Sequence, residues 1–191
     1  MNNTFQYKKS TRNMYNGCLY DSLLELKFVL SVENEYMYLR EPVIIGYDPI
    51  KCVSTNYLQE RTRIYKPDFL IRSPEGGPAL LIELKPTAWK NYYYQMRYEA
   101  IANSFISQRK LDWKYKILYS HEIILSRDQK LHFLELAKNK IAWSATLKMI
   151  KLDQKYNQKE VRYFSSTPNF RLHALSKKNY VEWVKYGRKS N

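Results

Sequence analysis

Residues 63–85 constrain the fold of this chain more than any other segment. They contain two apolar runs of strand type, RIYKPDFLI and ALLIELK, which are separated by the sequence SPEGGP at residues 73–78. Proline and glycine at this density interrupt a strand and favour a tight turn. The two runs, each read as a single strand, are therefore predicted to pair as an antiparallel hairpin. Pro86 is expected to end the second strand.

Helix-type and strand-type segments flank this hairpin. Residues 21–33 (DSLLELKFVLSVE) are predicted to form a helix with Asp21 or Ser22 as its N-cap. Residues 43–47 (VIIGY) are predicted to form a short strand, and residues 113–120 (WKYKILYS) an alternating one. The second of these strands follows a helix in the manner of a crossover connection. An α/β fold with a central mixed β-sheet flanked by helices is expected.

The longest helical stretch spans residues 90–110. One face of this helix is predicted to be buried, and it carries Tyr94, Tyr98, Ile101, Ala102 and Phe105. The opposite face carries Lys90 and Arg97, which could contact phosphates. Tyr92, Tyr93 and Tyr94 could stack on bases. Because Tyr94 falls on the buried face, however, only one or two of the others are expected to reach DNA.

The charge of the chain points to a polyanionic partner. Lys and Arg number 32 against 18 Asp and Glu, which gives a formal net charge of +14. The sequence has no run of 18 apolar residues, so membrane insertion is not expected. The expected location is the cytoplasm of a bacterium or of a phage-infected host.

Three parts of the chain are predicted: a basic N-terminal arm (1–20), a core (21–126) and a basic, partly helical C-terminal extension (127–191). Residues 131–150 of that extension could form one or two helices, and Lys177 and Lys178 could make non-specific phosphate contacts.

Three residues of the predicted hairpin have side chains suited to metal-dependent chemistry. Strand alternation puts Glu83 and Lys85 on one face, while Asp68 lies on the partner strand. Converging carboxylates repel one another unless a cation lies between them, and Mg²⁺ favours such oxygen ligands. The alternative is that Glu83 and Lys85 form a solvated strand face paired with Asp68.

Glu25 is the fourth candidate residue. Its neighbours at the i+3, i+4 and i+7 positions of the predicted helix are apolar: Phe28, Val29 and Val32. A carboxylate in an apolar stripe needs a partner, which could be a metal-bound water. It could otherwise lie at the edge of the stripe and reach solvent, or pair with an arginine.

In their order, YDSLLELKFVL, RIYKPDFLI, LLIELKP and WKYKILYSHEI resemble the PD-(D/E)xK nuclease superfamily, and within it the N-terminal catalytic domain of TnsA-like transposon endonucleases. The similarity covers about residues 20–125. It implies a restriction-endonuclease-like core that cleaves DNA phosphodiesters with Mg²⁺, for which Mn²⁺ can substitute. By motif, Asp68 and Glu83 would be metal ligands, Lys85 the catalytic lysine and Glu25 an outer-shell or second-metal carboxylate.

The function expected from this resemblance is endonuclease activity in transposition or in another mobile-element or phage process. A transposase or another recombination or phage protein could then supply sequence recognition. Two alternatives stay open. The first is a structure-specific nuclease, such as a junction resolvase or an enzyme that processes phage DNA ends. The second is a DNA-binding module that keeps the fold and does not cut.

Overall fold

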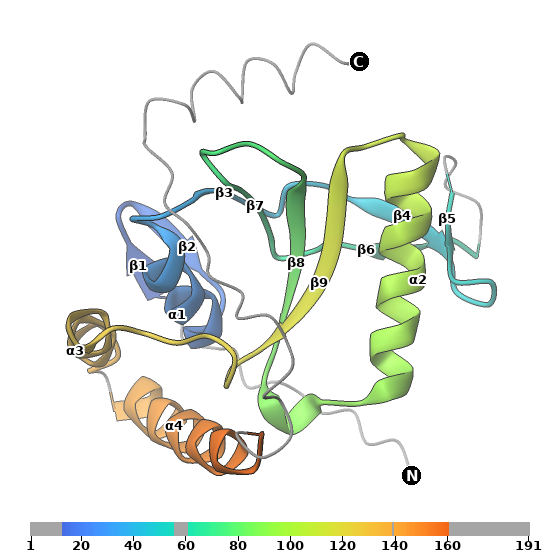
Figure 1. Cartoon of the computed structure of the whole chain (residues 1–191). Helices are drawn as coiled ribbons and strands as arrows, with labels where there is room; N and C mark the ends of the chain where they lie inside the picture. Colours follow the sequence, from blue (N-terminus) through green and yellow to red (C-terminus); the bar gives the residue numbers. More distant parts are fainter. Residues whose placement is uncertain (1–12, 56–60, 139, 161–191) are drawn as a thin grey trace, which may run out of the picture. The chain divides into compact units, whose positions relative to one another are not determined.

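The structure is a computed structural model that describes residues 13–55, 61–138 and 140–160 (Figure 1). The described chain divides into two compact units. Residues 32–119 form the first, which we call the sheet unit. Residues 13–31 and 120–160 belong to the second, which we call the helical unit. About half of the predicted C-terminal extension, including Lys177 and Lys178, lies outside the described residues.

A four-stranded mixed sheet organises the sheet unit. Its strands, in spatial order, are β3 (Met37–Arg40), β7 (Phe69–Arg72), β8 (Ala79–Lys85) and β9 (Trp113–Tyr119). β7 pairs antiparallel with β3 and with β8, whereas β9 runs parallel to β8, beside which it lies in Figure 1. In the turn from β7 to β8, Gly76 and Gly77 have φ values of 89° and 90°, which favour glycine. The predicted hairpin, crossover and mixed sheet are confirmed.

A second, antiparallel sheet contains β5 (Val53–Ser54), β4 (Ile45–Asp48) and β6 (Arg63–Tyr65) in that order. The prediction of a single strand over residues 63–71 is therefore wrong. Its first part is β6 of this small sheet, and its second part is β7 of the mixed sheet. The physical reason is Pro67, which has no N–H group for a strand ladder. The chain changes sheets at this proline, directly before Asp68.

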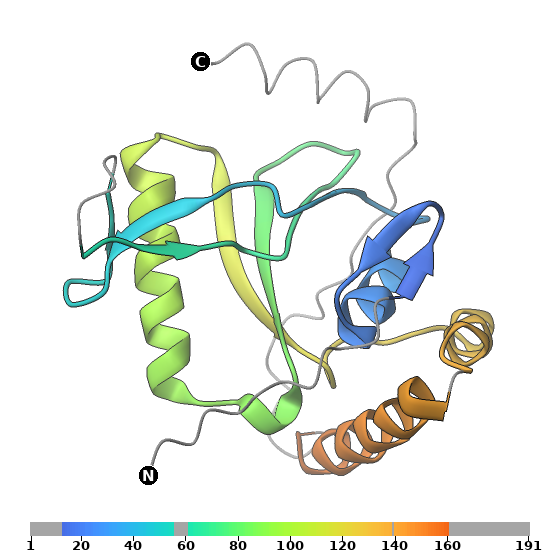
Figure 2. The ribbon, with the colours of Figure 1, turned by 180° about the vertical axis from the view of Figure 1, so that it is seen from behind.

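The long helix α2 (Tyr92–Gln108) lies between β9 and the small sheet, as Figure 2 shows from behind. A short 3-10 helix, η1 (Thr87–Trp89), connects it to β8. The Oγ of Ser104 accepts a hydrogen bond from the Ser54 N–H at 3.0 Å, and the Gln108 amide donates to the Ser54 carbonyl at 3.0 Å. These contacts fix β5 on α2.

The core of the sheet unit lies under α2. Its buried cluster consists of Ile45, Tyr47, Tyr65, Leu70, Ala79, Leu81, Ile101 and Ala102, with Tyr98 and Phe105 packed against it. The predicted buried face of α2 is thus confirmed at four of five positions. It is wrong for Tyr94, whose side chain is 56% exposed. Tyr94 lies in the first helical turn and stacks on Tyr98, with ring centroids 6.3 Å apart.

The helical unit contains the hairpin of β1 (Asn13–Tyr15) and β2 (Cys18–Tyr20), followed by α1 (Leu23–Val32), α3 (Arg127–Leu136) and α4 (Lys140–Glu160). The hairpin falls within residues 1–20, which the sequence predicts as a basic arm. It turns at Asn16 and Gly17, both with positive φ, as a two-residue Asn-Gly connection requires.

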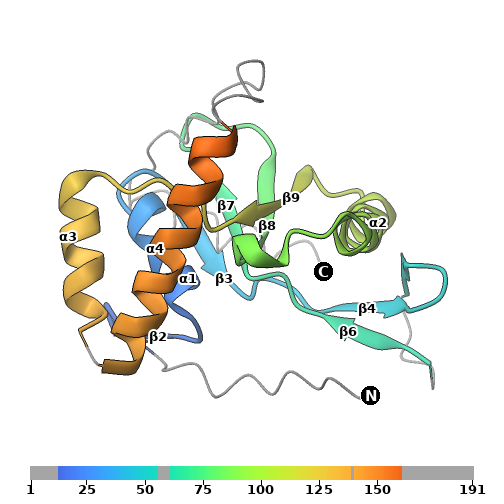
Figure 3. The same cartoon turned by 90° about the horizontal axis from the view of Figure 1, so that it is seen from below.

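Figure 3 shows α1, α3 and α4 of this unit, which are joined by side-chain contacts. Lys27 of α1 forms a 2.8 Å ion pair with Asp153 of α4. The Gln129 amide of α3 donates to the Leu30 carbonyl of α1 at 2.6 Å. Both α3 and α4 overlap residues 131–150, where one or two helices are predicted. None of the helices in the described part of the chain has the length and apolar character needed to cross a bilayer.

Candidate functional site

Glu83 lies on the face of the mixed sheet that α2 covers. Leu81, two residues earlier on β8, shares this face and belongs to the core cluster with Ile101 and Ala102. The Glu83 side chain is accordingly buried, with only 4% of the residue exposed. The alternative of a solvated strand face is therefore wrong for Glu83. A buried carboxylate at this position needs positive charge and hydrogen-bond donors around it.

Asp68 comes close to this carboxylate because of the strand register. Phe69 pairs with Ile82, so extending the antiparallel register by one residue places Asp68 opposite Glu83. The Leu84 N–H of β8 donates to Asp68 Oδ2 at 2.7 Å, and the Glu41 N–H donates to the Asp68 carbonyl at 2.8 Å. Both contacts fix Asp68 at the start of β7.

Lys85 supplies positive charge beside the two carboxylates. Its Nζ forms an ion pair with Glu83 Oε1, and its side chain is 28% exposed. Burial by itself would lower the pKa of Lys85, but the negative charges of Glu83 and Asp68 outweigh this effect and raise that pKa. Lys85 is therefore an ammonium ion at neutral pH, so it can hold an anion but cannot act as a general base there.

The hydroxyls of Tyr65 and Tyr115 also belong to this site. The Tyr65 hydroxyl of β6 donates to Glu83 Oε2 at 2.9 Å, and it lies 2.8 Å from the Tyr115 hydroxyl of β9. Since a hydroxyl has a single proton, Tyr115 must donate to Tyr65. Burial and the negative charge of Glu83 raise the pKa of both tyrosines far above the ordinary value, so both remain protonated donors. This chain of donors orients one carboxylate oxygen while Lys85 contacts the other.

Sequence reasoning did not identify Tyr65, Tyr115 or Tyr98 as residues of the site. The Tyr98 ring of α2 lies under Lys85, with the Nζ 5.6 Å from its centroid. One signal was present for Tyr115, because a parallel crossover brings the inward positions of β9 beside those of β8, and Leu81 pairs with Tyr115. No comparable signal existed for Tyr65, which belongs to the other sheet.

Glu25 belongs to the helical unit and contacts the two residues that precede α1. Its backbone N–H donates to Ser22 Oγ at 3.1 Å, and its carboxylate accepts from the Ser22 hydroxyl at 3.2 Å and from the Asp21 N–H at 3.4 Å. Ser22 is thus the N-cap of α1, and it is one of the two N-cap residues that the sequence predicts. Ser-x-x-Glu is a capping-box sequence, a role for Glu25 that the sequence reasoning did not consider. This role explains a carboxylate that is only 8% exposed. Its catalytic role stays a prediction.

The remaining predicted contact residues lie on or next to α2. Lys90 is exposed, and its Nζ lies 5.5 Å from the centroid of the Tyr119 ring. The Arg97 guanidinium lies over Tyr47 at 5.8 Å and donates weakly to the Pro49 carbonyl at 3.4 Å. Lys90 is thus exposed beside an aromatic ring, whereas Arg97 is partly used in packing against the small sheet.

The donors at this site suit a hard cation such as Mg²⁺ better than zinc. Mg²⁺ needs only one or two carboxylates, because waters and substrate oxygens complete its octahedron. Asp68 and Glu83 supply such a pair. Within the described ranges, no three His, Cys, Asp or Glu side chains gather as a metal-binding group, and Cys18 and Cys52 are free thiols.

Comparison of the chain with protein-family models, with curated proteins and with solved structures gave no match in any of the three.

Proposed function

We propose that this chain is a metal-dependent DNA endonuclease of the PD-(D/E)xK type, with a restriction-endonuclease-like core and TnsA-like ancestry. The observation that carries the proposal is the convergence of Asp68, Glu83 and Lys85 at one end of the β7–β8 hairpin. A carboxylate buried among apolar residues destabilises a fold unless it is paired, and here its partners are a cation and a donor hydroxyl. A protein that only bound DNA would gain nothing from carboxylates near a phosphate.

The three side chains can divide the work of phosphodiester hydrolysis. Asp68 and Glu83 would hold the divalent ion, which when bound supplies a Lewis acid at a phosphate oxygen and lowers the pKa of a water. Lys85, as an ammonium, would attract the scissile phosphate or hold the attacking water. Tyr65 keeps the Glu83 carboxylate in one orientation. The net charge of +14 would attract the DNA backbone over a longer range.

Plasmid nicking tests this proposal. Supercoiled DNA is incubated with the protein in Mg²⁺ or Mn²⁺ and, in parallel, in EDTA. Wild type is expected to nick only with metal. Asp68→Asn and Lys85→Gln are expected to lose at least about 100-fold in rate, because a metal site contributes several kcal/mol to catalysis and 1.36 kcal/mol is tenfold. Asp112→Asn is the matched control, since Asp112 is exposed at the start of β9.

Binding distinguishes the alternative of a DNA-binding module. Calorimetric titration with Mn²⁺ should give heat for wild type and none for Asp68→Asn. Plasmid retention without nicking, together with absent metal binding, would show that the chain is a binder rather than an enzyme. Participation in transposition, with a transposase or another recombination or phage protein as partner, is part of the same proposal and follows from the resemblance alone.

A further inference from the structure

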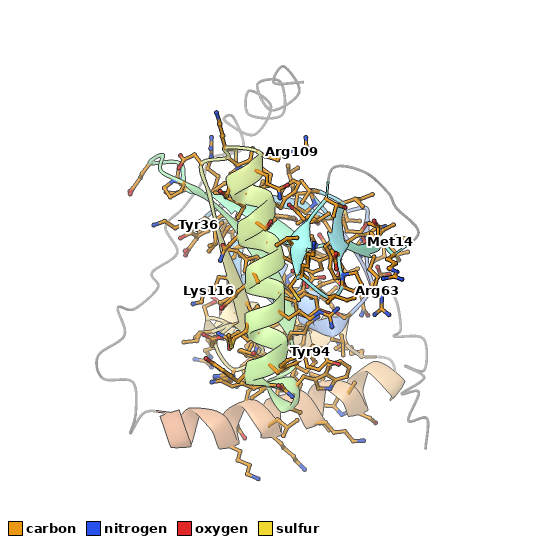
Figure 4. All side chains as sticks on the ribbon, turned by 90° about the vertical axis from the view of Figure 1, so that its right-hand side faces the viewer. Met14, Tyr36, Arg63, Tyr94, Arg109 and Lys116 are labelled. Carbon is orange, nitrogen blue, oxygen red and sulfur yellow. The ribbon has the colours of Figure 1, made fainter. Side chains whose placement is uncertain are left out.

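Four exposed aromatic side chains lie where β8 leads into α2. We call Trp89, Tyr92, Tyr93 and Tyr94 the aromatic patch. They are 47%, 77%, 72% and 56% exposed, respectively. Figure 4 shows Tyr94 at one end of α2 and Arg109 at the other. Rings this exposed bury little area and contribute little to the core, and exposed aromatic side chains close together in the chain are candidates for a binding surface.

The charge around the aromatic patch favours a polyanion. Between Leu84 and Tyr98 the sequence contains Lys85, Lys90 and Arg97 and no acidic residue. The first turn of α2 likewise has no acidic side chain, so the positive end of the helix dipole is not neutralised there. A protein partner with an apolar surface would need none of these cations. Aromatic rings interleaved with basic residues are typical of surfaces that bind single-stranded nucleic acid.

The aromatic patch is continuous with the candidate site. The Tyr94 ring stacks on the Tyr98 ring at an interplanar angle of 20°, and Lys85 Nζ lies over the other end of this pair, 5.6 Å from the Tyr98 centroid. Lys85 in turn contacts Glu83. A nucleotide strand whose phosphate reaches Lys85 could therefore also reach the Tyr94 ring.

We propose that the aromatic patch stacks unpaired DNA bases, so that the favoured substrate has a single-stranded segment beside the scissile bond, as in a flap, an overhang or a junction. A paired base is already stacked on its neighbours and cannot lie flat on a tyrosine ring. Duplex DNA would therefore contact only the cations. Cleavage beside this segment rests on the proposed nuclease function, whereas base stacking on the aromatic patch does not depend on it.

Binding in EDTA tests the stacking surface without any cleavage. Fluorescence anisotropy compares a labelled oligothymidylate with a duplex of equal length, for wild type and for a Tyr92→Ala/Tyr93→Ala variant. The alanine variant should lose at least about 30-fold in affinity for the single strand, because each base stacked on a ring contributes about fivefold or more. Its duplex affinity should change by less than about threefold, since backbone charge dominates that binding. A matched Tyr92→Phe/Tyr93→Phe variant keeps the rings and should bind as wild type does.

Tryptophan emission gives a second readout in the intact protein. A base stacked on Trp89 should quench part of the emission, and Trp89→Phe should abolish that part while the other tryptophans still emit. Equal losses on single strand and duplex, or no loss and no quenching, would overturn the proposal and leave the aromatic patch as a protein-contact surface. Cleavage of a flap substrate in Mg²⁺ is assayed separately, so a protein that stacks bases and does not cut contradicts only the proposed nuclease function.

Discussion

Removing the hydroxyl of Tyr65 tests how the Glu83 carboxylate is held. Tyr65→Phe deletes one oxygen atom that contacts both Glu83 at 2.9 Å and Tyr115 at 2.8 Å, and it leaves the buried ring in place. Tyr115→Phe is the matched control, because it removes the hydroxyl that contacts Tyr65 and leaves the bond to the carboxylate. The two variants thus separate the charged hydrogen bond from the neutral one.

The expected magnitudes follow from the types of bond lost. A hydrogen bond to a charged group contributes about 1.5–3 kcal/mol, and a neutral one about 0.5–1.5 kcal/mol. We expect Tyr65→Phe to lower the free energy of unfolding by about 3 kcal/mol, since it removes both the bond to the carboxylate and the bond to Tyr115. Tyr115→Phe should cost about 1 kcal/mol. Cleavage by Tyr65→Phe should fall about 10- to 100-fold, as is usual when a residue supporting a metal ligand is lost.

Urea unfolding followed by circular dichroism in EDTA measures the stability difference, with an unchanged slope as the check that only stability changed. Single-turnover cleavage at saturating DNA measures the rate. Equal stability losses in the two variants would refute the assignment of the charged bond to Tyr65. A Tyr65→Phe protein that is destabilised and cuts at the wild-type rate would show that the orientation of Glu83 is irrelevant to the chemistry.

Two further predictions concern the helical unit. The side chains of Lys27 and Asp153 are only 12% and 10% exposed, so Lys27→Met or Asp153→Leu alone leaves one buried charge and should lower the free energy of unfolding by about 3–5 kcal/mol. The double variant should be more stable than either single variant, and thermal unfolding of the three proteins measures the difference. Ser126 caps α3 by accepting from the Gln129 N–H at 3.2 Å, so Ser126→Ala should cost about 1 kcal/mol in urea unfolding, and Ser126→Asp, which can still cap, should cost less.

The parts of the fold that depend on local sequence could be predicted. The hairpin from β7 to β8 and the crossover to β9 follow from turn residues and alternation, and the convergence of Asp68 with Glu83 follows from them in turn. The split of residues 63–71 between two sheets could not be predicted from periodicity, because alternation continues through Pro67. Pro67 was the local signal for this change of sheet, because proline cannot donate to a strand ladder.

The errors at single residues have different origins. Helical periodicity places Tyr94 on the same face as Ile101, but it does not say where along α2 the covering sheet ends. Glu25 was predicted to need a partner because it lies in an apolar stripe of the helix, and Ser22, three residues earlier, is such a partner. A local contact of this kind can be found from sequence. Tyr65 could not be, since its contact with Glu83 spans 18 residues and two sheets.

The route of the chain past Pro67 has a mechanical consequence. Tyr65 ends β6, and Asp68 precedes β7, so only two residues separate an anchor in one sheet from a carboxylate on the other. Any change in the angle between the two sheets must therefore displace Asp68 and pull on the Tyr65–Glu83 hydrogen bond together. A load applied to the small sheet, for instance by a strand of nucleic acid or a bound protein, would be transmitted directly to both acidic side chains.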